Sequence, residues 1–113
     1  MARGGFPGIP GGNMQQLMRQ AQKMQQQMIQ LQEELDAREY EASSGGGMVH
    51  VKVNGKRELL ELTIKPEAVD PDDVEMLQDL VMAAVNEALR TGEETREREM
   101  ARVGGAAGMG GLF

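Results

Sequence analysis

Residues 48–64 read MVHVKVNGKRELLELTI, and apolar side chains alternate with polar ones on both sides of Asn54-Gly55. Alternation with a period of two is typical of a strand that buries one face. An Asn-Gly pair between two such segments is a strong signal for a β-hairpin. The segment therefore predicts two antiparallel strands, with three valines on the buried face of the first and two leucines and an isoleucine on that of the second.

The loop between these strands sets their register. A two-residue loop would place Val51 opposite Glu58, a charged side chain. A four-residue loop over residues 54–57 places Val51 opposite Leu60 and keeps the apolar residues on one face. Because the buried face fixes the register of a strand pair, we expect the four-residue loop.

A third strand is predicted upstream of the hairpin. Tyr40 and Ala42 share a parity, and the three glycines at 45–47 separate them from the hairpin. These glycines predict a turn rather than a phosphate loop, because no Lys-Ser or Lys-Thr follows them and the next element is a strand. His50 lies on the face opposite the valines, where we expect a surface residue, since a general base needs a partner and a pocket.

A long amphipathic helix precedes the sheet. It begins after Asn13, a good N-cap residue, and its apolar residues are spaced alternately by three and four. This seam consists of Met14, Leu17, Ala21, Met24, Met28, Leu31 and Leu35. Such spacing is typical of a helix packed along another helix. A helix over 13–38 would be about 40 Å long, so we expect part of it to project from so small a domain.

A second helix follows the sheet. Residues 70–73 (DPDD) predict its start, with Asp70 as the cap and Pro71 in the first helical position. Its apolar seam continues to Leu89, and Gly92 marks a hinge or the end of the buried part. The order helix, three strands, helix predicts an α+β fold with an antiparallel sheet.

The length and composition indicate one domain without enzymatic groups. The Gly/Pro-rich residues 1–12 and the Gly-rich residues 104–113 predict flexible ends around a single domain over 13–103. The 113 residues include one His and no Cys, which argues against zinc ligation and nucleophilic catalysis. No apolar run approaches the roughly 18 residues of a membrane helix. We expect a cytoplasmic protein that is not an enzyme and has no metal, cofactor, membrane or small-molecule partner.

The seam of the first helix has no partner in its own chain, because the second helix is needed to cover the sheet. A symmetric homodimer resolves this, with each copy covering the other's seam or with the two sheets joined edge to edge. We therefore expect an intertwined or sheet-joined homodimer with projecting helical arms.

The net charge of −6 conceals an asymmetry. Residues 1–32 carry three basic side chains and no acidic one, whereas residues 33–113 carry nine basic and 18 acidic side chains. Exposed charges more than about 10 Å apart are largely screened at 0.1 M salt, so local charge decides what a surface attracts. The N-terminal helix can thus meet a polyanion even though the whole chain is acidic.

Several segments, in their order along the chain, resemble the YbaB/EbfC nucleoid-associated proteins. They are the Gln/Met-rich first helix, GGGMV at 45–49, VKVNG at 51–55, IKP at 64–66, EMLQDLV at 75–81 and AVNEA at 84–88. The resemblance spans about residues 13–103. It implies a tweezers-shaped homodimer with projecting helices that binds double-stranded DNA, alters its conformation and serves nucleoid organisation and gene regulation.

Two groups of basic residues are candidates for DNA contact. Arg19 and Lys23 lie four residues apart on one helix face, and no acidic residue precedes Glu33, so they are suited to phosphates, with glutamine amides beside them. A solvated coiled-coil flank is the alternative. The second group is Arg90, Arg96, Arg98 and Arg102.

Nearby acidic residues compete with DNA for the second group. The spacing predicts the ion pairs Glu94–Arg98, Glu93–Arg96 and Glu99–Arg102. No base-reading motif is present, so we expect largely sequence-independent binding. The alternative function is a protein-interaction clamp without DNA affinity, in which arms lined with Met and Gln hold a client as prefoldin-like tentacles do.

Overall fold

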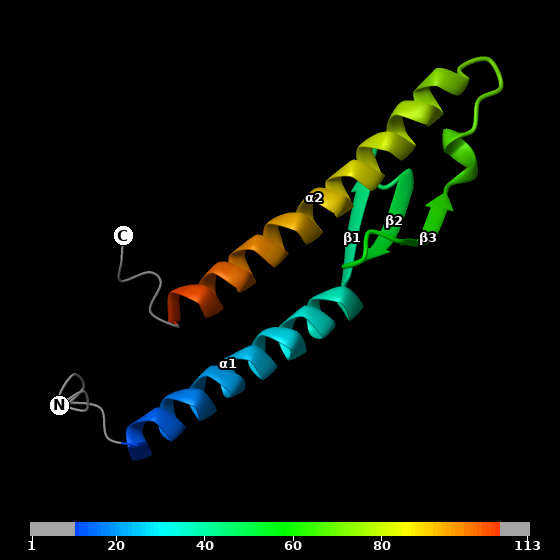
Figure 1. Cartoon of the computed structure of the whole chain (residues 1–113). Coiled ribbons are helices and arrows are strands. Elements are labelled where there is room, and N and C mark those ends of the chain that lie inside the picture. Colours follow the sequence, from blue (N-terminus) through cyan, green and yellow to red (C-terminus); the bar gives the residue numbers. More distant parts are fainter. Residues whose placement is uncertain (1–10, 107–113) are drawn as a thin grey trace.

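The computed structural model describes residues 11–106, which form two long helices and one sheet (Figure 1). In chain order the elements are α1 (Gly11–Ala37), β1 (Glu39–Ser44), β2 (Val49–Asn54), β3 (Leu59–Ile64), the 3₁₀ helix η2 (Pro66–Ala68) and α2 (Val74–Ala106). The sheet is antiparallel with strand order β1-β2-β3. The predicted α+β fold is confirmed.

The ends of the chain are only partly comparable with prediction. Helix α1 begins at Gly11 rather than after Asn13, and α2 reaches Ala106, three residues beyond the predicted domain over 13–103. The flexible segments that we predicted for the two ends fall largely on residues 1–10 and 107–113, which lie outside the described residues.

The core lies between one face of the sheet, called here the inner face, and α2. Val49, Val51 and Val53 of β2 are almost fully buried there, together with Ala84 and Ala88 of α2. The small alanines let the helix approach the sheet closely. Burial of each valine contributes about 1.5–3 kcal/mol, so β2 anchors the body of the molecule.

The predicted four-residue hairpin loop is wrong. Val51 pairs with Leu62 rather than with Leu60, and Val49 pairs with Ile64. The apolar face of β2 therefore still continues onto β3, but two residues further along the strand than we expected. Leu60 is the extra residue of a β-bulge beside Lys52/Val53.

The backbone of the loop explains this difference. The Asn54 N–H donates to the Glu58 carbonyl at 3.0 Å, which leaves three loop residues, 55–57. Arg57 has φ 66°, the left-handed conformation that commonly ends a three-residue hairpin loop. Arginine seldom adopts this conformation, so the sequence contains no sign of a three-residue loop.

Helix α2 also begins later than predicted. Asp70 Oδ1 accepts the N–H of Asp72 at 2.9 Å within a turn, so Asp70 is not the helix cap. Asp73 Oδ1 accepts the N–H of Met76 at 3.2 Å and takes that role. The cap therefore lies three residues beyond the predicted one.

Gly92 neither interrupts α2, which continues for 14 residues beyond it, nor ends its buried part, because Thr95 is buried as well. A Cβ at this position would lie 3.1 Å from the Tyr40 ring. Gly92 thus allows α2 to pass close to β1, which is a packing role that the polar sequence around it did not reveal.

Helix α1 projects from the body beside the C-terminal half of α2 (Figure 1). Of its predicted seam, Leu31 and Leu35 are buried, whereas Met14, Leu17 and Met24 are 50%, 54% and 41% exposed. The prediction that part of this helix projects, with a seam lacking a partner in the same chain, is confirmed for these residues.

Strand β3 is poorly covered. Its Leu59, Leu60 and Leu62 are 48%, 47% and 44% exposed. Val69 and Val74, in the connection to α2 and at its start, are exposed as well. We refer to these five residues as the β3 patch.

Candidate nucleic-acid interface

The basic face of α1 is fully accessible. Arg19 and Lys23 are exposed one helical turn apart, and they line an open hollow together with Gln16, Gln20 and Gln26. Within residues 13–103, neither cation has a carboxylate within 4.0 Å. Their charge is therefore available to an anion.

This basic face turns away from the buried seam. At about 100° per residue, Lys23 lies about 120° and Arg19 about 160° around the helix from Leu35. Leu35 packs inward at the junction with the body. Arg19 consequently points largely away from this seam, and Lys23 points to one side of it.

The arginines of α2 have different surroundings. Arg90 is paired with Glu87 at 2.5 Å and with Glu94 at 2.9 Å. The Arg90 guanidinium, which hydrogen-bonds to Glu87, lowers the pKa of that carboxyl, and Glu87 in turn raises the pKa of Arg90. The charge of Arg90 is thus compensated within its own helix.

The pairing predicted along α2 is only partly correct. Arg102 pairs with Glu99 at 3.0 Å, as the spacing predicted. Glu94 pairs with Arg90 rather than Arg98, so Arg98 contacts only the Thr95 hydroxyl, at 3.4 Å, among the side chains of residues 13–103. Arg98 is therefore a free cation within that range.

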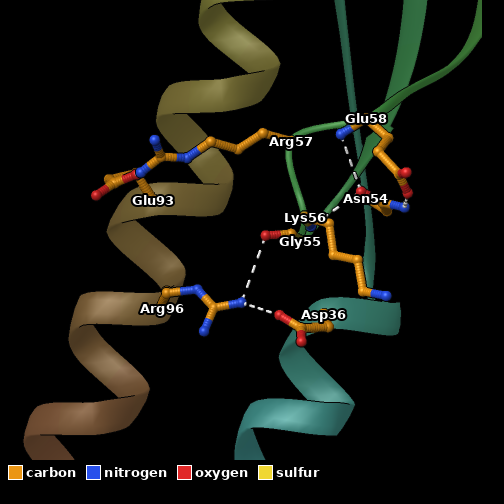
Figure 2. A network of polar contacts seen from close by, with 8 residues as sticks. All are labelled: Asp36, Asn54, Gly55, Lys56, Arg57, Glu58, Glu93 and Arg96. Atoms are coloured by element: carbon orange, nitrogen blue, oxygen red, sulfur yellow. Dashed lines mark hydrogen bonds and ion pairs between the residues drawn. The ribbon is translucent and has the colours of Figure 1, made fainter.

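Arg96 lies at the junction of three elements (Figure 2). We expected it to pair with Glu93, but Glu93 binds Arg57 of the hairpin loop. Arg96 Nη2 instead donates to Asp36 Oδ1 of α1 at 2.5 Å and to the Gly55 carbonyl at 3.4 Å. Its guanidinium therefore links α2 to both the end of α1 and the hairpin loop.

The hairpin loop rests directly on the last turn of α1. The Gly55 N–H donates to the Asp36 carbonyl at 3.1 Å. A Cβ at Gly55 would lie 1.8 Å from the Leu35 carbonyl oxygen, so any side chain at this position would displace the loop or the helix. The Asn54 side chain holds the loop from the other side by accepting the N–H groups of Lys56 and Glu58.

Sequence reasoning missed this junction and three free cations. Arg38, Lys56 and Lys65 are exposed and have no ion pair within the described side chains. Each lies in a loop or connection, so no helical spacing marked it. Asp36 and Arg96 are 60 residues apart, and no local pattern joins them.

The outer face of the sheet carries a polar ladder. His50 Nδ1 lies 2.8 Å from the Ser43 hydroxyl, and His50 Nε2 lies 2.8 Å from Glu41 Oε1. In a Ser-His-Asp triad the hydroxyl and carboxylate contact the opposite nitrogens. Lys52, whose pKa its hydrogen bond to Glu61 raises, lies beside them. The structure places His50 on the sheet surface, as predicted.

The comparison with known protein families is decisive. A family model described as the YbaB/EbfC DNA-binding family matches residues 11–107, which include both helices and the whole sheet. The chain belongs to this family. The resemblance inferred from the sequence segments is confirmed.

Relatives of the YbaB/EbfC protein match it along its whole length. A nucleoid-associated protein of Clostridium novyi (strain NT) is 58% identical, with all of both chains covered. A nucleoid-associated protein of Acetivibrio thermocellus is 57% identical over the same share of each chain. The crystal structure of an uncharacterized protein from Helicobacter pylori has a TM-score of 0.63 at 29% identity and covers 83% of this chain and 96% of its own.

Family membership favours DNA over a protein client as the partner of the arms. The YbaB/EbfC family is a DNA-binding family, and these curated relatives are named nucleoid-associated proteins. Over residues 11–106, neither helix has an apolar stretch long enough to cross a bilayer. Because the family binds DNA, the cations on α1 that have no ion pair within residues 13–103 are candidates for contact with phosphates.

Proposed function

We propose that the chain binds double-stranded DNA through the basic face of α1, as a homodimer and largely without regard to base sequence. The observation that carries this proposal is the exposed pair Arg19 and Lys23, which have no ion pair within residues 13–103 and are surrounded by glutamines. Cations supply the sequence-independent affinity for phosphates, and amides add hydrogen bonds to the backbone.

The five predicted contact residues contribute unequally in this proposal. Arg19, Lys23 and Arg98 contact phosphates, because no carboxylate within residues 13–103 pairs with them. Arg90 contributes less, because Glu87 and Glu94 already hold it. Arg96 faces Asp36 and acts at the junction rather than on the duplex.

The β3 patch supports the proposed dimerisation. Leu59, Leu60 and Leu62 leave almost half of their surface in water. Full burial of a leucine contributes about 1.5–3 kcal/mol, so a dimer in which a second copy covers this strand would be substantially more stable than the separate copies. Joined at β3, two copies carry two α1 arms on one body.

The mechanism is electrostatic and geometric. Two arms that grip phosphates at separate points along a duplex hold it in one path, and this alters its conformation without chemistry. The protein acts in the nucleoid, within the cytoplasm, by binding alone. No enzymatic step, metal or cofactor is needed.

The experiment that tests this function reverses the charge of the basic face. We expect Arg19→Glu/Lys23→Glu to weaken binding to a random-sequence duplex by at least about 100-fold at low salt, because two attractive contacts become repulsive. The shift of a fluorescent duplex in a native gel measures this. Lys65→Glu, on the body, should bind like the parent protein.

Normal duplex binding by the double variant would contradict the proposed interface. If the parent protein also failed to bind duplex while capturing protein clients, the protein-clamp alternative would replace it.

A further inference from the structure

Helix α1 is attached to the rest of the chain at one end only. Every residue over 13–30 is exposed except Met28, which is half-buried. The buried residues Leu31 and Leu35 lie in its last two turns. The direction of the arm is therefore set at its C-terminal junction.

Three kinds of contact fix that junction (Figure 2). The Gly55 backbone binds the Asp36 carbonyl, and the space there admits no Cβ. The Arg96 guanidinium binds the Asp36 carboxylate and the Gly55 carbonyl. The Arg57–Glu93 ion pair ties the same loop to α2.

We propose that Asp36, Gly55 and Arg96 form a brace that fixes the direction of the α1 arm and so positions Arg19 and Lys23 on DNA phosphates. This inference rests on the proposed DNA contact of α1. Arg96 is a positioning residue that acts through Asp36. It lies on α2, whereas the proposed phosphate contacts lie on α1.

The length of the arm makes this brace matter. Arg19 lies 36 − 19 = 17 residues from Asp36, which is about 26 Å at 1.5 Å per residue. A rotation of about 10° at the junction would move Arg19 by about 4–5 Å, more than the length of about 2.7–2.9 Å of a charge-assisted hydrogen bond to a phosphate oxygen. A small change at the brace therefore moves the cations out of contact with their phosphates.

The sign of one substitution separates this role from simple electrostatics. Asp36 is acidic, so if it were only a surface charge, its neutralisation would leave DNA affinity unchanged or raise it. The brace requires the opposite result. We expect Asp36→Asn in the full chain to weaken binding to a random-sequence duplex by at least about fivefold at low salt, because the bound arrangement is no longer preorganised.

Two variants control this measurement. Glu33 lies on the same helix, is exposed and has no ion pair within the described side chains. Glu33→Gln makes the same change of charge and should bind as well as the parent protein or better. Asp36→Glu keeps the carboxylate and should restore most of the affinity.

A double substitution tests whether Arg96 acts through Asp36. If it does, Asp36→Asn/Arg96→Gln should bind about as weakly as the weaker single variant. If Arg96 instead contacts a phosphate, Arg96→Gln reduces the magnitude of the slope of log affinity against log salt concentration by about 0.9. In that case Asp36→Asn alone does not weaken binding. That second pattern would overturn the proposal.

The direction of the arm can be measured without DNA. The chain has no cysteine, so spin labels attach only at introduced sites such as Gln25→Cys on α1 and Ala101→Cys on α2. Labelled protein diluted with unlabelled protein reports the distance within one chain. We expect a narrow distance distribution in the parent and in Glu33→Gln, and a broad or shifted one in Asp36→Asn.

The two measurements separate the brace from the proposed function. An unchanged distance distribution in Asp36→Asn overturns the brace, and a broadened one with unchanged affinity overturns its role in binding. A parent protein that binds no duplex overturns the proposed function and the positioning role together, whatever the labels show. Far-UV circular dichroism confirms folding. If Asp36→Asn does not fold, Arg96→Gln carries the distance measurement, which does not depend on the sign of the charge removed.

Discussion

Individual arginines in this chain differ in what their charge can do. Arg19 and Arg98 have no carboxylate partner within residues 13–103, Arg90 has two, and Arg96 has one on another element. The net charge, which is negative for the whole chain, hides this difference. We therefore propose that the pairing of each arginine, rather than the number of basic residues, decides which side chains contact DNA.

Arg19 offers a direct test at this scale. We expect Arg19→Gln to lower duplex affinity about three- to tenfold and the magnitude of the salt slope by about 0.9, because one phosphate contact is lost. Lys65→Gln removes the same charge from the body and should change neither quantity. Fluorescence anisotropy at several salt concentrations measures both, and equal losses in the two variants would show that only net charge matters.

Glu87 holds the Arg90 side chain in an ion pair and so limits its contact with DNA. Because Arg90 lowers the pKa of Glu87, their pairing persists above the unfolded pKa of the carboxyl and is lost only as the pH falls through the lowered value. Arg90 is therefore held at neutral pH. We expect Arg90→Gln to weaken duplex binding less than twofold and Glu87→Gln to strengthen it, each measured at pH 7. A large loss in Arg90→Gln would place Arg90 on the duplex.

The sequence reveals these residue-scale features unevenly. The shared face of Arg19 and Lys23 follows from their spacing of four, which needs no tertiary information. The partner of Arg96 could not be predicted in this way, because Asp36 approaches it only after the sheet brings α1 and α2 together. Local ion-pair rules assigned Glu93 to Arg96, but the hairpin loop supplied a competing arginine.

At the scale of elements, the periodicity of apolar residues predicted which helices and strands form, and backbone geometry decided where each of them begins and ends. The seams of both helices and the alternation of the strands are regular enough to predict each element. The loop at 55–57 and the cap at Asp73 depend on single φ values and single hydrogen bonds. These are the features on which the predicted register and the predicted helix start were wrong.

Gly55 is the element-scale position with the strongest constraint. We expect Gly55→Ala to destabilise the fold by about 2–4 kcal/mol, because its Cβ would overlap a backbone carbonyl that has little room to move. Urea unfolding followed by circular dichroism measures this. Lys56→Ala, on the neighbouring exposed residue, should change the free energy of unfolding by less than about 0.5 kcal/mol, and a similar loss in both would remove the special role of Gly55.

At the scale of the whole molecule, the described chain is elongated, with extents of 85 × 25 × 18 Å. One sheet and one half of α2 form the body, and the arms extend from it (Figure 1). The projecting helix could be predicted because its length exceeds what a small domain can cover. The homodimer stays a prediction, supported by the exposed leucines of β3.

Leu60 tests the dimer. We expect Leu60→Lys to give monomers in sedimentation velocity at about 10 µM, because burial of a charged side chain costs more than the leucine contributed. Thr63→Lys adds the same charge on the outer face of the same strand and should leave the parent's sedimentation unchanged. A parent protein that is itself monomeric at this concentration would contradict the dimer.

The proposed binding of duplex DNA by this family member, through a few phosphate contacts, is tested most directly by its dependence on salt. With two or three phosphate-contacting cations per copy and two copies, four to six contacts predict a slope of about −4 to −5 in log affinity against log salt concentration. Titration of the full chain into random-sequence duplexes, read by anisotropy, should give that slope and the same affinity for different sequences. No binding at low salt, or binding that does not weaken with salt, would contradict it.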